Sequence, residues 1–356
     1  MNDKFKVVII GATLPSMGGV EIHIARMMDI LKENGIDYEQ IDPRCCIDAP
    51  KGLRQLKFYM TLLKASGTLY HFHTSHIISL WVFMALLSLI GKKVIYTLHN
   101  ENIADEIENK VIGFMKYLSL KICFKRYSHI ICVNQRMKDT LVSIGFNHRK
   151  ISLIPAFIPQ SIIDPSTIPN NIKEFIDTHS PTITGYACSI YNYQGVDRYG
   201  VDMMIDVVDR LKKKFPNIGL ILSIPNPDDE NLQKIEVYKE DIKKRKIEKN
   251  IHICIINIDL TSLFQITDVY IRPSTTDGDP VAIREALYIN VPTVSSDRTW
   301  KPDGTILHRD RDAEDFKKMV EYALNNLKEE HEKLKRIAKP EFGMDILHLY
   351  KSLCGK

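Results

Sequence analysis

Residues 6–35 read KVVIIGATLPSMGGVEIHIARMMDILKENG and predict a strand, a glycine-containing loop and a helix, in that order. Lys6–Ile10 is a short run of β-branched residues, which favours a buried strand. Gly19–Glu33 follows as a helix and is ended by Asn34-Gly35. A strand followed by a helix that returns to the next strand is the repeating unit of a parallel sheet covered by helices.

The same alternation continues as far as residue 154. Further strands are predicted at 69–73, 93–98, 130–133 and 151–154, and helices at 77–90 and 135–144. Residues 77–90 form the longest apolar run, fourteen residues that include two serines. This is shorter than the roughly 18–20 residues that cross a bilayer, so we expect a buried helix there.

A second α/β series follows a proline-rich stretch at 155–181, which has the character of a linker. Its strands are predicted at 182–187, 219–223, 251–255, 269–271 and 293–295, and its helices at 200–214, 229–247, 280–287 and 312–325, with a last helix at 343–353. The sequence therefore predicts two doubly wound Rossmann-like domains, 1–160 and 161–339, which face a central cleft. The remaining residues, 340–356, carry the last predicted helix. Ligands of such sheets bind at the carboxyl ends of the strands.

Composition supports an ordinary globular protein with two domains. The 356 residues are 44% hydrophobic and 26% charged, with 17 Gly and 16 Pro, which excludes fibrous and largely disordered classes. Seven scattered cysteines without a C-x-x-C pair fit neither a disulfide framework nor a zinc knuckle. The N-terminus has no secretory signal, so we expect a cytoplasmic protein.

Basic residues are concentrated in the first part of the chain. Residues 1–160 hold 20 Lys and Arg against 13 Asp and Glu, whereas the remainder has a net charge of −3. Many of these basic residues lie among apolar ones, at 51–64 and 114–126. Such stretches suit the surface of an anionic membrane, or they are ordinary solvated helix faces. No nucleic-acid partner is expected, because no binding motif accompanies the charge.

Two groups in the first domain are candidate site residues. Gly18 and Gly19 would let the backbone approach a ligand at a helix start, although a tight turn explains them equally well. His71, His73 and His76 could be drawn as a metal site, but no acidic or cysteine ligand stands beside them, so we predict none. His99 ends a predicted strand and either contacts a polar substrate or is structural.

The most informative segment is YIRPSTTDGDPVAIRE at 270–285. A strand leads through a turn of small residues into a helix that starts near Pro280. The free N–H groups of Val281 and Ala282 at that start would bind phosphate. Asp277 and Glu285 could accept hydrogen bonds from a polyol, or they could be a helix-capping aspartate and an exposed glutamate.

Taken together, these segments resemble the GT-B glycosyltransferases, specifically the retaining glycosyltransferase family 4, over nearly the whole chain. The resemblance extends from the opening strand, loop and helix to LYHFHTSH at 69–76, KKVIYTLHNEN at 92–102 and the segment 128–158. It is most specific at TDVYIRPSTTDGDPVAIREALYINVPTVSSD, residues 267–297, which looks like the donor-site segment with the E-x7-E motif.

The resemblance implies that the C-terminal helix, within 340–356, crosses back to the first domain. It also implies roles for particular residues. His99 would face the donor sugar, Asp277 would stand in for the first glutamate of E-x7-E and contact that sugar, and Glu285 would hold the ribose. Asp279 is a nearby competitor of Asp277. The diphosphate would lie against two further groups: Gly18 and Gly19, and the segment Gly278, Asp279, Pro280, Val281 and Ala282.

The chain departs from the family where an arginine and a lysine usually bind the diphosphate. Tyr199 stands at the lysine position and Tyr186 at the arginine position. A diphosphate leaving group needs positive charge as its bond breaks. We therefore expect Arg198 or Arg272 to supply that charge.

The implied activity is retaining transfer of a sugar from a nucleotide-sugar, with UDP as the expected nucleotide, without a metal or other cofactor. The expected acceptor is a glycan, carried on a polyprenyl lipid at the inner face of the cell membrane, as in bacterial O-antigen or capsule synthesis. The alternatives are a nucleotide-sugar epimerase of the same fold and an inactive GT-B binding subunit.

Overall fold

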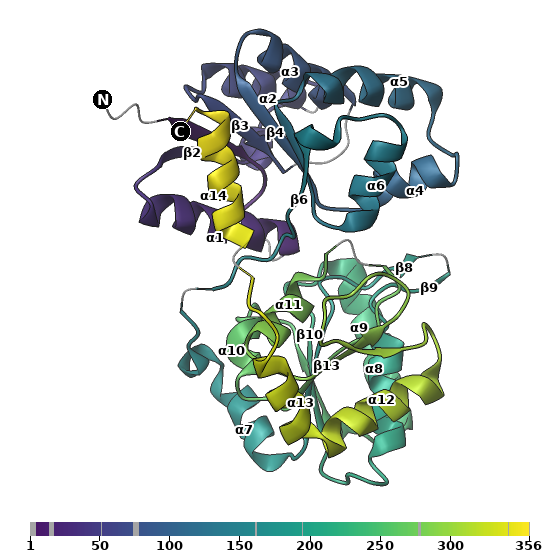
Figure 1. The fold of residues 1–356 in the computed structure, drawn as a ribbon. Helices are drawn as coiled ribbons and strands as arrows, with labels where there is room; N and C mark the ends of the chain where they lie inside the picture. The colour runs from purple at the N-terminus through teal and green to yellow at the C-terminus, as the bar shows by residue number, and fades with distance from the viewer. Residues whose placement is uncertain are drawn as a thin grey trace. The chain divides into compact units, whose positions relative to one another are not determined.

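The chain forms two compact units, each built on its own parallel sheet (Figure 1). The computed structural model describes residues 5–13, 18–50, 52–73, 78–160, 162–193, 195–276, 279–340 and 342–355. Unit 1 comprises Met1–Ile158 and Glu341–Lys356, and unit 2 comprises Pro159–Pro340.

Unit 1 has a six-stranded sheet in the order β2-β1-β3-β4-β5-β6, and its neighbouring strands are all parallel. The strands are β1 (Lys6–Ile10), β2 (Asp37–Ile41), β3 (Leu69–Phe72), β4 (Lys93–Leu98), β5 (His129–Cys132) and β6 (Ile151–Leu153). The helices are α1 (Gly19–Glu33), α2 (Arg54–Lys64), α3 (Ile78–Leu89), α4 (Asn102–Glu108), α5 (Phe114–Cys123), α6 (Gln135–Ser143) and α14 (Phe342–Leu353). The strand order changes direction between β1 and β3.

The first and last helices pack together on one face of the unit 1 sheet. Met27 and Leu31 of α1 share a core with Leu347 and Tyr350 of α14 and with Ile9 of β1. Burial on both faces explains why β1 is an unbroken apolar run rather than an alternating one. The chain therefore leaves unit 1 after residue 158 and returns to it for its last helix.

Unit 2 has a six-stranded parallel sheet in the order β11-β10-β7-β12-β13-β14. The strands are β7 (Thr182–Tyr186), β10 (Gly219–Ser223), β11 (Ile251–Cys254), β12 (Val269–Arg272), β13 (Thr293–Ser296) and β14 (Ile306–His308), with a separate hairpin of β8 (Asn192–Tyr193) and β9 (Val196–Asp197). The helices are α7 (Asn170–Thr178), α8 (Val201–Leu211), α9 (Asp229–Lys244), α10 (Leu260–Phe264), α11 (Val281–Tyr288), α12 (Ala313–Asn325) and α13 (Leu327–Lys335). Numbered within the unit, this is the Rossmann order 3-2-1-4-5-6, and it reverses between β7 and β12.

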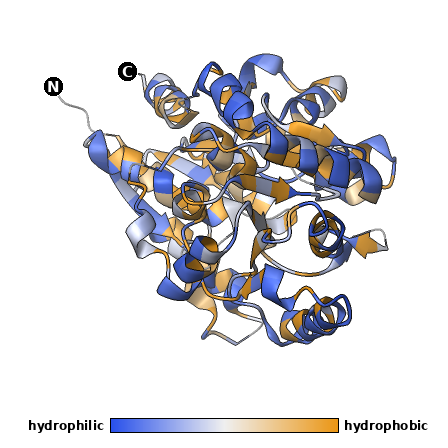
Figure 2. Cartoon of the chain, turned by 90° about the horizontal axis from the view of Figure 1, so that it is seen from below, coloured by the Kyte–Doolittle hydropathy of each residue, from blue (hydrophilic) through white to orange (hydrophobic). Residues whose placement is uncertain are grey.

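Amphipathic helices cover both sheets. In Figure 2 the central strands are largely hydrophobic, while the helices carry both hydrophobic and hydrophilic residues along their length. In unit 2, Met204 of α8 and Phe316 of α12 pack on one face of the sheet, and Ile283 of α11 lies in a separate core. The apolar sides of α8, α11 and α12 thus face the sheet of unit 2, as the 3.6-residue period requires.

The structure differs from the sequence-based expectation at the sheet edges and at α3. The edge strands β2 and β14 were not predicted. Polar residues interrupt the apolar pattern of β2, and β14 has only three residues. The expectation of a buried helix at 77–90 is wrong for one face of α3. Trp81 and Met84 are buried, whereas Val82, Leu86 and Leu89 are exposed. Within the described residues, no helix is long and apolar enough to cross a membrane.

Candidate functional site

The reversal of strand order in unit 2 brings two loops together at the carboxyl edge of its sheet. β7 and β12 are parallel neighbours, with Gly185 beside Ile271, and they end at Tyr186 and Arg272. Doubly wound sheets bind their ligands outside the carboxyl ends of the strands at such a reversal. A ligand site is therefore expected at the loops that follow these two strands.

Two arginines lie against one tyrosine at this edge. The guanidinium carbon of Arg272 is 4.9 Å from the centre of the Tyr199 ring, and that of Arg198 is 5.5 Å from the same centre. Arg198 also lies 5.0 Å from the centre of the Tyr191 ring. Burial raises the pKa of Tyr199, so its hydroxyl stays neutral beside Cys188 Sγ, 2.8 Å away. Two guanidinium groups in one place form a strong attractor for an anion.

The turn that carries Arg198 and Tyr199 is held by the side chain of Asp197. This carboxylate accepts hydrogen bonds from the backbone N–H groups of Tyr199 and Val201, both at 3.0 Å, and from the Tyr238 hydroxyl at 2.7 Å. Asp197 thereby satisfies N–H groups at the start of α8. Our sequence reasoning missed this residue, although an aspartate just before a helix is a recognised capping signal.

Gly200 lets this turn approach the strand end that carries Arg272. It adopts a φ of +69°, and a Cβ atom there would lie 2.6 Å from the carbonyl oxygen of Pro273. The backbone N–H of Thr275 also donates to the carbonyl of Arg198 at 2.9 Å. The two loops are thus joined through their backbones, which fixes the positions of both arginines.

Helix α11 starts at the same edge. Its first residues, Val281 and Ala282, are buried, and the residue before them is Pro280, whose side chain does not cap the helix. The helix packs through Ala282, Ile283 and Ala286 in a core that includes Tyr270 of β12. The first N–H groups of any α-helix have no partner within the helix. Those of α11, with the positive end of its dipole, lie at the carboxyl edge of the sheet, where they favour a bound anion.

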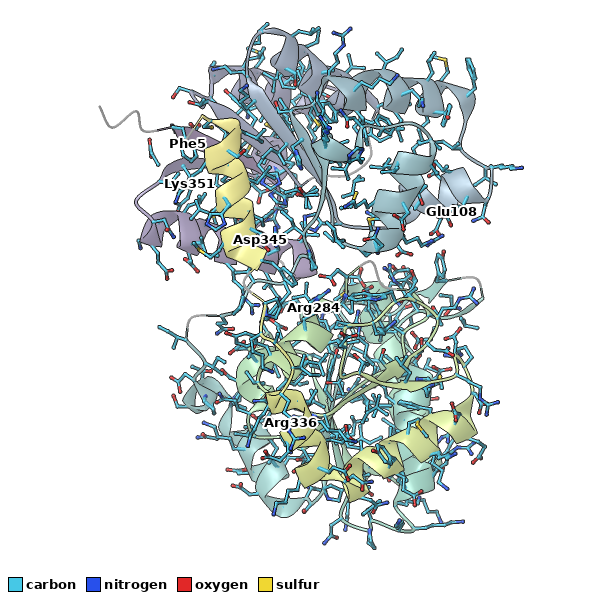
Figure 3. The ribbon with its side chains drawn as sticks, viewed as in Figure 1. Phe5, Glu108, Arg284, Arg336, Asp345 and Lys351 are labelled. Carbon is cyan, nitrogen blue, oxygen red and sulfur yellow. The ribbon has the colours of Figure 1, made fainter. Side chains whose placement is uncertain are left out.

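The carboxylates of the predicted donor motif have different environments. Glu285 is 3% exposed, so the alternative interpretation of an exposed surface glutamate is wrong. Asp279 is buried and forms an ion pair with Arg284, with 2.6 Å between Oδ1 and Nε. The Arg284 guanidinium, labelled in Figure 3, also lies 5.2 Å from the Trp300 ring centre. Asp277 and Gly278 lie outside the described residues.

In unit 1 the predicted residues gather at the corresponding edge of the sheet. β1, β3 and β4 lead into Gly11, His73 and His99, and the His73 N–H donates to the carbonyl of Ile10 at 2.8 Å. Gly18 caps α1, which begins at Gly19. Leu14–Met17 of the preceding loop and His76 lie outside the described residues.

Three imidazole rings meet at this edge, one of which the sequence did not reveal. The ring centres of His23, His73 and His99 are 5.2–5.3 Å apart, pair by pair. His23 comes from the second turn of α1, and its position after the glycines carries no signal that we recognised. His73 Nδ1 and His99 Nε2 are 2.9 Å apart and share a hydrogen bond.

Burial keeps the His23 and His73 rings neutral. It lowers the pKa of His23 to about 4 and lowers the pKa of His73 well below its ordinary value. His71, which the sequence grouped with His73, has a different role. Its Nδ1 and Nε2 form hydrogen bonds with the Tyr350 and Thr97 hydroxyls, at 2.5 and 2.6 Å. His71 therefore links the sheet to α14.

An ionic network holds the segment that follows His99. Glu101 accepts from Asn134 Nδ2 at 2.6 Å and from Arg136 Nη1 at 2.5 Å, and Arg136 also pairs with Asp105 and Glu108. Burial raises the pKa of Glu101, and Arg136 opposes that rise. This network ties the start of α4 to the start of α6 and so limits movement of the loop that carries His99.

The fold and these two edges define a GT-B protein, the two-domain fold of many glycosyltransferases. The family described as Glycosyl transferases group 1 matches residues 180–340, and Glycosyltransferase Family 4 matches residues 17–161. Together the two matches cover most of the chain, which therefore belongs to the family 4 glycosyltransferases.

Solved structures show the same fold at low sequence identity. The structure of Anabaena Alr3699/HepE in complex with UDP and glucose has a TM-score of 0.71 at 13% identity, covering 98% of this chain and 100% of that one. A glycosyltransferase from Rickettsia africae has a TM-score of 0.70 at 12% identity, covering 99% of each chain.

Two curated relatives are more similar in sequence. An uncharacterized glycosyltransferase of Haemophilus influenzae is 24% identical over 219 residues, 61% of this chain and 54% of the relative. One subunit of human phosphatidylinositol N-acetylglucosaminyltransferase is 23% identical over 318 residues, 79% of this chain and 60% of the relative. The chain thus spans little more than half the length of these relatives.

Proposed function

We propose that the protein is a retaining glycosyltransferase that needs no metal. It would transfer a sugar from a UDP-sugar donor to a lipid-linked glycan acceptor at a membrane surface. The observation that carries this proposal is the pair of arginines against Tyr199, at the sheet edge where α11 begins. A transferase that loses the usual lysine and arginine still needs cations for its leaving group, and this pair supplies them.

In this proposal different residues bind the diphosphate, the ribose and the sugar of the UDP-sugar donor. Arg198 and Arg272 bind the diphosphate together with the first N–H groups of α11, and Glu285 binds the ribose hydroxyls. By the family resemblance, Asp277 and His99 contact the donor sugar. The Anabaena protein has been solved in complexes with UDP, with UDP and glucose, and with UDP-glucose, which supports UDP as the nucleotide.

Retention is proposed to follow from transfer on one face of the sugar. The bond between the anomeric carbon and the phosphate oxygen breaks, and its electron pair leaves on the diphosphate. The acceptor oxygen then bonds to the same face and passes its proton to that phosphate. The arginines stabilise the negative charge that develops, which is where electrostatic catalysis contributes most.

A thermal-shift panel of UDP-, GDP-, ADP- and dTDP-sugars, with and without EDTA, tests the donor assignment. A ligand that binds the native state raises the melting temperature by mass action, so no acceptor is required. We expect one UDP-sugar to stand out, with no effect of EDTA. The shift should disappear in Glu285→Ala and persist in Glu240→Ala, an exposed glutamate on α9. Absence of any shift would favour the inactive binding subunit.

The anomeric configuration of the product, measured by NMR, tests retention. An inverted product would contradict the proposed mechanism. Conversion of the nucleotide-sugar into its epimer without any acceptor would instead identify an epimerase.

The proposed membrane contact is the apolar face of unit 1, formed by α2, α3 and α5 (Figure 1). α2 and α3 are joined by stacked Tyr59 and Phe83 rings, 4.7 Å between centres, and α3 packs beside α5. Each helix presents apolar residues at helical spacing that are 40–76% exposed: Leu56, Met60, Leu63, Val82, Leu86, Leu89, Phe114, Met115, Leu118 and Ile122.

The charge around this face selects an anionic surface. Residues 49–100 and 109–138 contain no aspartate or glutamate, and Lys57, Lys64, Lys93 and Lys125 are exposed among them. Each basic residue near an anionic bilayer contributes about 1 kcal/mol, and exposed apolar side chains add to this by burial in the headgroup region. A peripheral position would bring the enzyme to an acceptor whose lipid lies in the bilayer.

Co-sedimentation with phosphatidylcholine vesicles, with and without phosphatidylglycerol, tests this face. We expect binding only to the anionic vesicles, weaker at high salt, and largely lost in the double variant Met60→Asp, Leu86→Asp. Val237→Asp, at an exposed valine of α9 in unit 2, is the matched control and should bind normally. Equal binding of the double variant and the wild type would refute this surface.

A further inference from the structure

The three histidines at the edge of the unit 1 sheet have the composition of a metal site. His23, His73 and His99 each offer a ring nitrogen, and these nitrogens all lie within 4.8 Å of one another. The rings come from three different elements: α1, the end of β3 and the end of β4. The sheet and the helix that packs on it therefore fix the backbone positions of the three residues.

The hydrogen bond of His23 determines which of its ring nitrogens has a lone pair that can bind a metal ion. Its Nδ1 lies 2.6 Å from the carbonyl oxygen of Ala156, which can only accept, so Nδ1 carries the proton. A neutral imidazole then has its lone pair on Nε2. Histidines that bind metals are usually oriented in this way, with the other ring N–H given to a carbonyl or carboxylate.

Two of these nitrogens are buried without a hydrogen-bond partner among the described residues. They are Nε2 of His23 and Nε2 of His73, on side chains that are only 2% and 5% exposed. An unsatisfied buried polar atom costs about 1–3 kcal/mol, and a bound ion or water is one of the few things that offsets it.

We propose that His23, His73 and His99 bind one transition-metal ion of the Zn²⁺ class, and that the bound ion inhibits sugar transfer. Neutral imidazoles suit Zn²⁺, whose three-histidine sites leave a fourth position open. Ligands at about 2.0–2.1 Å from the ion must lie closer together than 4.8 Å. The half-buried His99 ring therefore turns toward the ion and leaves its hydrogen bond with His73.

Inhibition follows because His99 cannot ligate an ion and contact a donor sugar through the same nitrogen. This second part rests on the proposed function, whereas the binding site does not. The metal is thus an inhibitor and has no part in the transfer reaction.

Zn²⁺ titration by calorimetry tests the site without any sugar. Cys45 and Cys46, with 3.4 Å between their sulfur atoms, could also bind Zn²⁺, so the titration uses the protein with both changed to serine. We expect one Zn²⁺ per chain, bound at least about 10- to 100-fold more weakly in His23→Gln and His73→Gln, as for losses around other metal sites. His148→Gln, at an exposed histidine, should bind like its parent. An unchanged affinity in His73→Gln, or no binding at all, would overturn the site.

X-ray absorption of the Zn²⁺-loaded wild-type protein tests the ligands of the ion without any substitution. Its result therefore does not depend on whether a variant folds. Three or more nitrogen or oxygen ligands at about 2.0–2.1 Å, with imidazole scattering, are expected. A sulfur shell without imidazole scattering would place the ion at the cysteines and overturn the proposal.

The inhibitory role is tested separately, by transfer assays with Zn²⁺ and then with excess EDTA. Full transfer by the Zn²⁺-loaded protein would overturn inhibition. Failure of transfer under all conditions, with Zn²⁺ binding intact, would count against the proposed function rather than against the metal site.

Discussion

Replacing Arg272 by methionine removes one of the two guanidinium groups against Tyr199 while keeping an apolar side chain of similar length. Arg272 is 6% exposed, so a phosphate bound to it would be partly shielded from water. A hydrogen bond to a charged group contributes about 1.5–3 kcal/mol. We therefore expect the affinity for UDP to fall by about 10- to 150-fold.

The positions of the two arginines also predict that Arg272→Met changes the melting temperature of the unliganded protein only slightly. The guanidinium carbons of Arg198 and Arg272 lie 5.5 and 4.9 Å from one ring centre, so they are at most about 10 Å apart. At an effective dielectric constant of about 20, their repulsion amounts to at least roughly 1.7 kcal/mol. Relief of this repulsion should offset part of the packing that the variant loses, and the melting temperature should change little.

Calorimetric titration with UDP and with uridine separates a diphosphate contact from a general disturbance. Arg272→Met should weaken the binding of UDP but leave the binding of uridine close to that of the wild type. Lys239→Met, at an exposed lysine of α9, serves as the matched control for loss of one positive charge. Equal losses for UDP and uridine, or an undiminished affinity for UDP, would refute the assignment of Arg272 to the diphosphate.

Three further predictions concern the supports of the site and the stability of the fold. Asp197→Ala should lower the free energy of unfolding by about 1–3 kcal/mol in urea titrations, because N–H groups at the start of α8 lose their acceptor, and it should weaken UDP binding through Arg198; unchanged stability would contradict this role. Gly200→Ala should cost about 2–4 kcal/mol, because a left-handed φ is combined with a Cβ too close to Pro273. Gly195→Ala, with a φ of +84° but no atom within 4 Å of its Cβ, should cost only about 1–2 kcal/mol, and equal costs would show that the contact with Pro273 is unimportant. Burial lowers the pKa of His129 from 6.5 to about 4, so the unfolded chain binds more protons below pH 6.5 and stability is lost as the pH falls toward 4. His129→Gln should therefore lose about 2 kcal/mol less than the wild type between pH 8 and pH 5, and parallel losses would count against a neutral buried His129.

The central strands of both sheets could be predicted from the sequence, because a strand buried on both faces is a short unbroken run of β-branched and other apolar residues. β1 and β10 are examples, with residues buried almost throughout. The edge strand β2, DYEQI, could not be predicted in this way, since one side of an edge strand faces solvent and tolerates polar residues. The exposed face of α3 was missed because an apolar run does not reveal which of its side chains a neighbouring helix covers.

The candidate site was predictable in part. The segment 270–285 indicated a helix start with nearby carboxylates, and the structure has α11 begin at Val281 with Glu285 buried in it. Asp197 and His23 were missed. A single aspartate or histidine carries little signal until the chain brings its partners to it from distant positions.

By itself, the sequence determined the central strands, several of the helices, and which turns carry glycine, proline or carboxylates, because these depend on neighbours along the chain. Only the tertiary structure decided that Arg198 and Arg272, more than seventy residues apart, lie against one tyrosine, and that three histidines from separate elements meet. In a parallel sheet the carboxyl ends of adjacent strands always share an edge. Which strands are adjacent is set by how the helices pack on the sheet faces, so residues distant in sequence meet only after the whole unit has folded.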